Sequence, residues 1–285
     1  MSAFIPMIHA CISSRFYKIR SMGARCVAAI IPTNTVPRQI IDSFNCMDLS
    51  QQNILQGELM GIKHLGEFYS YRSQRKPVFC NSKFLGVANV AAILEGMTMK
   101  MDMLMKENPN PLTRAAFIDI SLALFRDEPK AEALKKSLSE ICLRDITQGK
   151  YFPIGKQHYL ARATSVVLEY IETHSESKED TKILVQLLNS PDEEIVHQTL
   201  TWLEKPKNAY SSEEMINAVQ KFTVPPKDKW EVCSATALRV LATYLDKSDS
   251  MTQLSVCLAP RERAVLPVRD AWLALSGCAI KMVIP

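Results

Sequence analysis

One pattern constrains the fold of this chain more than any other: an apolar residue followed in most copies by Arg, His or Cys, and then a helical run of small and apolar residues that ends at a breaker. The copies are Ile19-Arg20, Ile54-Leu55, Thr113-Arg114, Ala161-Arg162, Val196-His197, Val232-Cys233 and Val268-Arg269, the last four spaced 35, 36 and 36 residues apart. This period is typical of helix pairs that bury their apolar faces only by stacking. We therefore expect an all-α fold, an α-solenoid of HEAT- or armadillo-like helical repeats.

Helical runs separated by prolines and polar turns fill the chain. We expect helices at about 3–12, 16–31, 37–44, 50–71, 82–106, 112–125, 129–145, 157–174, 192–204, 212–222, 228–245 and 267–282. A polar turn is expected at 72–77 and a charged loop at 175–180. On the second helix, helical spacing predicts one apolar face made of Ile19, Met22, Gly23, Cys26, Val27 and Ile30.

We expect residues 1–285 to form a single continuous solenoid. Solenoids normally end in capping repeats with a polar outer face, whereas residues 3–12 and 279–285 are apolar. On this ground the chain is predicted to be a fragment of a longer array.

The positive charge is concentrated near the N-terminus. Residues 1–80 hold 9 Lys and Arg against 4 Asp and Glu, and the remaining 205 residues hold 25 against 26. This region is where an anionic partner would dock, unless the charges are simply solvated. No apolar run is long enough to span a bilayer, so no membrane insertion is expected.

The chain contains 8 cysteines, never closer together than 15 residues and mostly within apolar helical runs. This spacing does not fit a zinc or redox site, and it predicts buried, reduced thiols in a cytosolic protein. The alternate methionines Met97, Met99, Met101, Met103 and Met105 spread around a helix. They serve either as core packing or as a partly exposed contact surface.

Enzymatic sequence motifs are missing. The chain has no G-x-G-x-x-G, P-loop, H-E-x-x-H or G-x-S-x-G sequence, and its five histidines are dispersed. We therefore predict no catalytic residue, no metal ligand and no cofactor for this chain.

Two clusters mix basic and aromatic side chains. The first contains Arg15, Phe16, Tyr17, Lys18, Arg20 and Arg25, and the second contains Tyr69, Tyr71, Arg72, Arg75 and Lys76. Cationic groups neutralise phosphates and aromatic rings stack on unpaired bases, so both clusters are candidate RNA- or partner-binding sites. The alternative for the first cluster is that Arg20 pairs with a neighbouring carboxylate and Tyr17 packs inside. For the second, it is plain solvation. The segment 149–159, which contains Lys156 and His158, is a weaker candidate.

Residues 1–70 contain several short runs that together resemble one family. They are Phe4-Ile5-Pro6, Phe16-Tyr17-Lys18-Ile19-Arg20-Ser21-Met22-Gly23-Ala24-Arg25, Ile31-Pro32, Gln52-Asn53 and Gly57-Glu58-Leu59-Met60-Gly61. This segment resembles the C-terminal half of THADA-type proteins, which are large cytosolic α-solenoids. It departs at Gln56, where the family more often has histidine.

The resemblance implies a function. Such proteins are regulatory subunits for an FtsJ-type methyltransferase that 2'-O-methylates the ribose of nucleotide 32 in the tRNA anticodon loop. The partner enzyme would bind S-adenosylmethionine, and tRNA would be the substrate. The resemblance marks Tyr17, Lys18, Arg20, Arg25 and Asn53 for testing. The alternative is a protein-binding scaffold or adaptor without an RNA role, for example one that regulates a membrane pump or transport complex.

Overall fold

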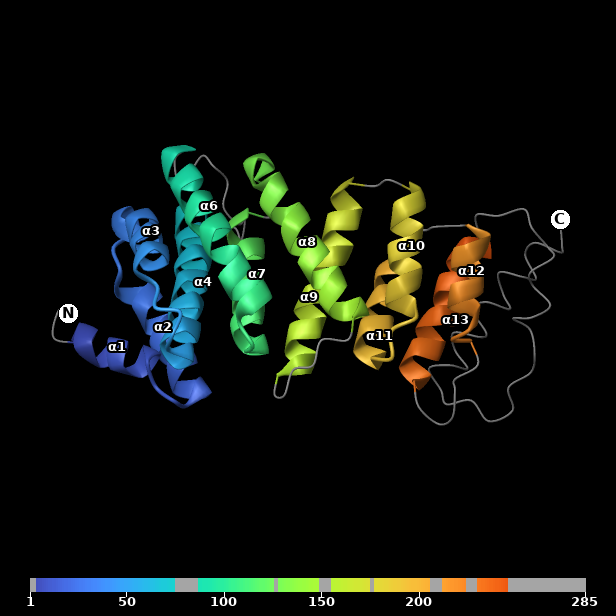
Figure 1. Ribbon diagram of the computed structural model, residues 1–285, viewed down its shortest axis with the longest axis horizontal. Coiled ribbons are helices and arrows are strands. Elements are labelled where there is room, and N and C mark those ends of the chain that lie inside the picture. Colours follow the sequence, from blue (N-terminus) through green and yellow to red (C-terminus); the bar gives the residue numbers. More distant parts are fainter. Residues whose placement is uncertain are drawn as a thin grey trace. The chain divides into compact units, whose positions relative to one another are not determined.

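The structure is a computed structural model that describes residues 4–74, 87–125, 128–148, 155–174, 177–205, 212–223 and 230–245. Within these ranges the chain folds into helices joined by short connections and contains no strand (Figure 1). The all-α helical-repeat fold predicted from the sequence is therefore confirmed. The chain divides into two compact units, one made of residues 1–144 and 150–166 and the other of residues 145–149 and 167–285.

In the first unit, short helical hairpins follow one another along the chain. The helices are α1 (Ile5–Ile12), α2 (Tyr17–Ile30), α3 (Val36–Cys46), α4 (Gln52–Gln74), α6 (Val87–Met101), α7 (Pro111–Phe125) and α8 (Glu132–Thr147), followed by the start of α9 (Lys156–His174). Single turns add η2 (Thr33–Thr35), η3 (Asp102–Glu107, a π-helical turn) and η4 (Pro129–Ala131). Helix α2 packs on α4 and α4 on α7, whereas α3 packs on α6. The second helices of successive hairpins (α2, α4 and α7) therefore form one layer, and the first helices α3 and α6 form another. The short α1 packs against both α2 and α4.

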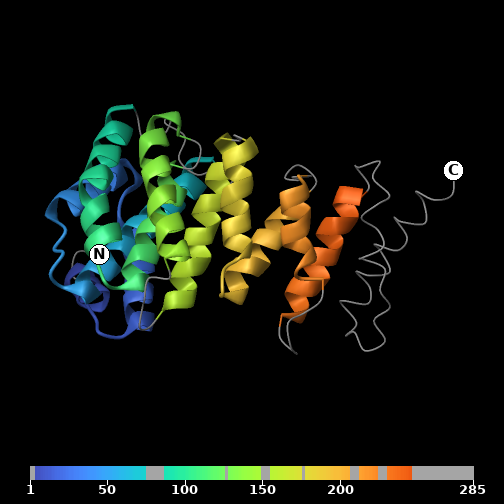
Figure 2. The same ribbon diagram turned by 45° about the vertical axis from the view of Figure 1, so that its right-hand side comes forward.

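The second unit repeats this arrangement. It contains α10 (Ser177–Leu188), α11 (Glu193–Leu203), α12 (Glu213–Gln220) and α13 (Glu231–Leu245). Helix α10 packs on α11 and α12, and α13 packs on α11 and α12. Figure 2 shows the orange α12 beside the orange-red α13 from a second direction.

The repeated sequence pattern marks equivalent positions in the hairpins. Its copies fall in the N-terminal part of the second helix of each pair, on α2, α4, α7, α9, α11 and α13. At the second position of the pattern, three residues are completely buried: Leu55, Arg114 and Cys233. The 35- and 36-residue spacing therefore reflects successive second helices. Val268-Arg269 lies outside the described residues.

The apolar face predicted for α2 is only partly buried: Gly23 lies in the helix contact, but Ile19, Met22 and Cys26 are exposed. The buried residues are Arg20, Gly23, Ala24 and Ala28, whereas Ile19 and Met22 are 41% and 66% exposed. The reason is steric: α1 and α4 approach α2 closely, so small residues line the contact and larger apolar side chains are left outside.

Parts of two predicted connections are helical. Residues 72–74 of the turn expected at 72–77 belong to α4, which continues to Gln74, and residues 75–77 lie outside the described residues. The loop expected at 175–180 is replaced from Ser177 onward by α10, which the sequence prediction omitted. Glu179 and Asp180 in its first turn complement the helix dipole, and Leu184, Leu187 and Leu188 supply its buried face.

The cysteines and methionines are divided between core and surface. Cys142 and Cys233 are buried as predicted, but Cys26 and Cys46 are exposed, and all the described cysteines are free thiols. Met97, Met101 and Met105 are buried, whereas Met99 and Met103 are exposed. Core packing is therefore confirmed for Met97, Met101 and Met105, and a contact surface stays a prediction for the exposed Met99 and Met103.

Candidate partner interface and pocket in the first unit

Arg20 is part of the fold and not of the surface. Its side chain is 5% exposed. One Nη donates hydrogen bonds to the Ser14 carbonyl oxygen at 2.7 Å and to Asn53 Oδ1 at 3.1 Å, and the other donates to Gln56 Oε1. Burial lowers the pKa of Arg20, because removal from water disfavours the charged guanidinium. All three acceptors are neutral. The structural alternative for Arg20 predicted a carboxylate as its partner. The structure supports a structural role, but the partners are two carbonyl-type side-chain oxygens and a backbone carbonyl oxygen.

Arg114 occupies the matching place on α7. It is fully buried, and its Nε donates to the carbonyl oxygen of Asn108 at 2.7 Å. Like Arg20, it thus bonds a carbonyl six residues earlier, in the connection that leads into its own helix. Its guanidinium lies 5.9 Å from the centre of the Tyr159 ring. Arg20 and Arg114 therefore brace the turns that lead into α2 and α7.

The accessible candidates lie on the exposed face of α2, which we define by Lys18, Met22, Arg25 and Cys26. Met22 is 66% exposed between the two cationic side chains. Tyr17 is 48% exposed and therefore does not pack inside as the alternative prediction required. This face offers positive charge next to apolar surface, a combination that suits a phosphate backbone or a protein partner.

The other predicted site residues are distributed differently. Asn53 is an exposed residue whose Oδ1 is used by Arg20. Arg72 lies in the last turn of α4. Arg75 and Lys76 lie outside the described residues. The structure therefore brings Tyr17, Lys18 and Arg25 together on one helix, with Asn53 holding Arg20 from the next repeat.

Two glycines allow the close packing of α1 against its neighbours. A Cβ atom at Gly57 would lie 2.2 Å from the Ile12 carbonyl oxygen, and one at Gly23 would lie 2.9 Å from the Cys11 Cβ. Both distances are too short for any other residue unless the backbone moves. Much of the family-like sequence around these glycines is thus explained by helix packing.

Beside this contact lies a pocket of about 290 Å³ between α1, α2, α3 and α4. Its inner wall contains Ile12, Ile62 and Leu65, which are buried, and its rim contains the exposed Gln39 and Asp42. Glu58 also lines it, and no hydrogen-bond partner is present for the buried Glu58 Oε2. Burial raises the pKa of Glu58, and the negative charge of Asp48 raises it further.

Glu58 belongs to the family-like run Gly57-Glu58-Leu59-Met60-Gly61, but the sequence analysis did not predict it as a residue that binds a ligand. The available signal was a carboxylate on a helix between two glycines and next to apolar positions. Such a residue is expected to be poorly solvated.

Charged side chains also connect the second helices of the first unit. Lys63 of α4 lies 2.6 Å from Asp119 of α7, and Arg162 of α9 lies 3.0 Å from the other oxygen of Asp119. Next to them, burial lowers the pKa of His158, as does the positive charge of Arg162. These contacts explain Lys63, Asp119 and Arg162 as structural residues, without catalysis.

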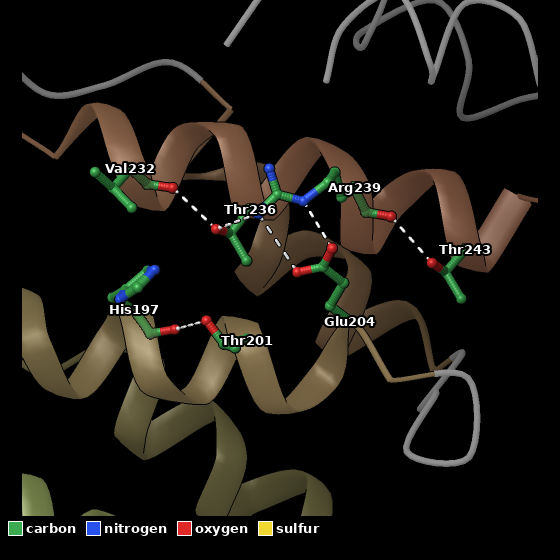
Figure 3. Close-up of polar contacts among 7 residues, drawn as sticks. All are labelled: His197, Thr201, Glu204, Val232, Thr236, Arg239 and Thr243. Carbon is green, nitrogen blue, oxygen red and sulfur yellow. Dashed lines mark hydrogen bonds and ion pairs between the residues drawn. The ribbon is translucent and has the colours of Figure 1, made fainter. Parts of the chain in front are cut away.

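The second unit has its own ion pair between second helices. Arg239 of α13 donates from Nε to Glu204 Oε1 at 2.7 Å and from an Nη to Thr236 Oγ1 at 3.0 Å. Figure 3 shows Arg239 and Glu204 pointing toward each other between α11 and α13. Glu204 and Arg239 are 35 residues apart, one repeat length.

In the part of the chain that the structure describes, no group of three or more His, Cys, Asp or Glu residues is arranged to hold a metal ion. Nor does any helix within those ranges have both the length and the apolar character required to cross a bilayer.

Comparison with known proteins supports the family resemblance. A family profile described as "Trm732, C-terminal TPR repeats" matches residues 1–65. TPR arrays, like HEAT arrays, are stacks of helix pairs. This segment contains α1, α2 and α3, the Arg20 contacts and the first part of α4, including Glu58.

Three curated relatives are similar to longer parts of the chain. The mouse and dog proteins, both named tRNA (32-2'-O)-methyltransferase regulator THADA, are 27% and 29% identical over 49% and 45% of this chain. The Schizosaccharomyces pombe protein, named tRNA (32-2'-O)-methyltransferase regulator trm732, is 20% identical over 99% of it. The chain spans only 7% of the mouse and dog proteins and 20% of the yeast protein. No solved structure matches the chain. The resemblance to THADA-type proteins predicted from residues 1–70 is thus confirmed.

Proposed function

We propose that this chain acts as a non-catalytic regulatory part of a tRNA methyltransferase complex. In this complex an FtsJ-type enzyme binds S-adenosylmethionine and 2'-O-methylates the ribose of nucleotide 32. The chain contributes a surface that orients the tRNA or the enzyme. It would do so in the cytosol.

The observation that carries this proposal is the exposed face of α2. Lys18 and Arg25 are exposed within residues 1–65, the segment that the family profile matches. Arg20, between them in sequence, is consumed by internal hydrogen bonds. The positive charge that α2 offers to a partner is therefore that of Lys18 and Arg25, and the names of the relatives point to a tRNA methyltransferase complex.

The mechanism is one of positioning. A scaffold that holds the tRNA in reach of the enzyme makes methyl transfer effectively intramolecular, which lowers the barrier without a catalytic group on the scaffold. Stacked helix pairs suit this role because they display an extended surface on a rigid frame.

Reconstitution tests the proposal. The purified chain, the FtsJ-type methyltransferase, tRNA and S-adenosylmethionine are combined, and the 2'-O-methyl group at nucleotide 32 is measured by mass spectrometry of nuclease fragments. We expect methylation to rise with the chain present, and no methyl transfer by the chain alone. Methylation that is unchanged by the chain would contradict the proposal.

Charge-reversal variants locate the surface. Lys18→Glu combined with Arg25→Glu should lower the stimulation at least 10-fold, whereas Lys130→Glu combined with Lys136→Glu, both exposed, serves as the charge-matched control and should leave it unchanged. Equal effects of the two variants would argue against the α2 face.

The second candidate is a protein-binding scaffold without an RNA role. It is favoured by exposed apolar side chains on α2, since Met22 on the exposed face and Ile19 next to it are both accessible. Salt-dependent tRNA binding distinguishes the two. Contacts through several Lys and Arg weaken steeply as salt rises, whereas a pure protein scaffold would show little tRNA binding at any salt concentration.

A further inference from the structure

We infer that the pocket between α1, α2, α3 and α4 receives one basic side chain of a partner protein, with Glu58 as its counter-ion. The ligand chemistry is a guanidinium or primary ammonium group on an apolar stem. The inference is independent of the proposed function, because it concerns neither tRNA nor methyl transfer.

The first argument is the unsatisfied carboxylate. Glu58 Oε2 is buried without a hydrogen-bond partner, and an ionised carboxylate in such a place carries a desolvation cost that a cation would offset. Rotation about the last side-chain bond exchanges the two oxygens, so either one can face the pocket. A guanidinium or ammonium group in the pocket can then donate a charge-assisted hydrogen bond to the oxygen that faces it.

The second argument is the sign of the surrounding charge. The described residues that line the pocket include Asp42 as well as Glu58, but no lysine or arginine, and His9 is the only one able to become positive. Asp48 adds negative charge near Glu58. Arg38 pairs with Asp42 at 3.6 Å, but both side chains are more than half exposed, so the pairing is weak. The pocket therefore lacks an internal cation for Glu58.

The third argument is size and lining. At about 290 Å³, the pocket lies at the small end of ligand sites, which range over roughly 300–1,000 Å³. Its wall of Ile12, Ile62 and Leu65 suits the methylene stem of a long basic side chain, and Glu58 suits the head group. These features favour a single inserted side chain over a larger ligand.

Gly61 provides a way to close the pocket without removing charge. It lines the pocket, and a Cβ atom added there would meet no atom within 4 Å. Gly61→Ala should therefore be accommodated, whereas Gly61→Leu should occupy the space of the stem. Both substitutions keep good helix formers in α4.

The binding test uses the whole chain and capped amino acids. Nα-acetyl-arginine N-methylamide is titrated by NMR, with the capped citrulline as its neutral isostere. We expect saturable, millimolar binding of the arginine compound and at least 10-fold weaker binding of citrulline. Binding should fall at least 10-fold in Glu58→Gln and in Gly61→Leu but persist in Gly61→Ala. Circular dichroism confirms that each variant is folded.

Several results would overturn the inference. Equal binding of arginine and citrulline compounds would remove the role of charge, and full binding in both Glu58→Gln and Gly61→Leu would place the interaction elsewhere. Absence of binding up to about 50 mM of the capped arginine, weaker than any useful small-ligand affinity, would also reject it.

A second titration distinguishes a protein side chain from a free polyamine. If the ligand is a side chain, the capped arginine should bind at least as tightly as spermidine. Much tighter binding of spermidine, lost in Glu58→Gln, would assign the pocket to small polyamines and contradict the partner-protein inference.

Discussion

Arg20 of α2 donates a hydrogen bond to Gln56 of α4, which lies 36 residues later in the sequence, one repeat length away. The same guanidinium bonds the Ser14 carbonyl in the connection before α2. One side chain thus joins a turn to the next second helix. Because Gln56 is only 2% exposed, this link belongs to the interior of the first unit.

We predict that Arg20→Ala destabilises the first unit by about 2–3 kcal/mol, because it leaves the buried Gln56 Oε1 and the part-buried Ser14 carbonyl oxygen without donors. Arg25→Ala should change stability by less than about 0.5 kcal/mol, since Arg25 is exposed. Urea unfolding followed by circular dichroism measures both values. Equal stability losses would show that burial does not separate the two arginines.

The arginine on α2 illustrates what the sequence could reveal about the fold. The 36-residue spacing correctly predicted stacked second helices, because the same packing position recurs in each repeat. The buried face of α2 was not predictable from hydrophobicity. Its contact surface is made of Gly23, Ala24, Ala28 and a hydrogen-bonded arginine, while Met22 points outward.

The helix α10 and the pocket were missed for related reasons. Charged residues at 178–180 looked like a loop, although acidic residues in a first turn stabilise a helix. The burial of Glu58 and its place in the pocket depend on how closely α4 packs against α1, α2 and α3. Local sequence patterns do not contain this information. The sequence pattern marked Lys18, Arg20 and Arg25 alike as candidate site residues, because all three are basic. It did not indicate that Arg20 is buried and that Lys18 and Arg25 are exposed.

Two glycines on α4 should respond oppositely to the same substitution. Gly57→Ala forces a Cβ against the Ile12 carbonyl, at 2.2 Å before relaxation, and should destabilise the protein by about 1–3 kcal/mol. Gly61→Ala meets nothing within 4 Å and should stabilise it by about 0.5–1 kcal/mol through its helix propensity. Thermal and urea unfolding measure the difference. Destabilisation by both substitutions would contradict the open space at Gly61.

Two glutamates on α4 should have opposite effects on the pH dependence of stability. The pKa of Glu58 is raised by burial, and that of Glu67 is lowered, first by its hydrogen bond with His64. The charged form of Glu58 is therefore unfavourable in the folded state, and its cost grows as pH rises from about 4.5 through the raised pKa. The contribution of Glu67 is present above about 4.5 and is lost as pH falls through its lowered pKa.

Accordingly, Glu58→Gln should raise the free energy of unfolding at pH 7, and Glu67→Gln should lower it. Both differences from wild type should shrink in acid. The neighbours that could change the Glu58 titration are Asp48, Asp42 and His9, so each variant is compared with wild type over the same pH series. A Glu58→Gln variant less stable than wild type at pH 7 would show that the carboxylate is paired in solution.

In the second unit, the Arg239–Glu204 pair should contribute modestly. The side chains are 42% and 34% exposed, and partly exposed ion pairs have coupling energies of about 0.2–1 kcal/mol. A double-mutant cycle with Arg239→Ala and Glu204→Ala, measured by urea unfolding, gives this energy. We expect it to decrease in 1 M NaCl. A coupling above about 2 kcal/mol would mean that the pair is more strongly desolvated than its exposure indicates.

Cysteine reactivity should follow the division between surface and core. Burial raises the pKa of Cys233 to about 12, so only about one molecule in 10,000 carries the reactive thiolate at pH 8. Cys142 is buried as well, whereas Cys26 and Cys46 are exposed. Iodoacetamide at pH 8, followed by peptide mass spectrometry, should label Cys26 and Cys46 within minutes and label Cys142 and Cys233 only after unfolding in urea. Rapid labelling of Cys233 in the folded chain would show that α13 separates from α11 in solution, because its thiol lies 3.8 Å from the carbonyl oxygen of Glu193.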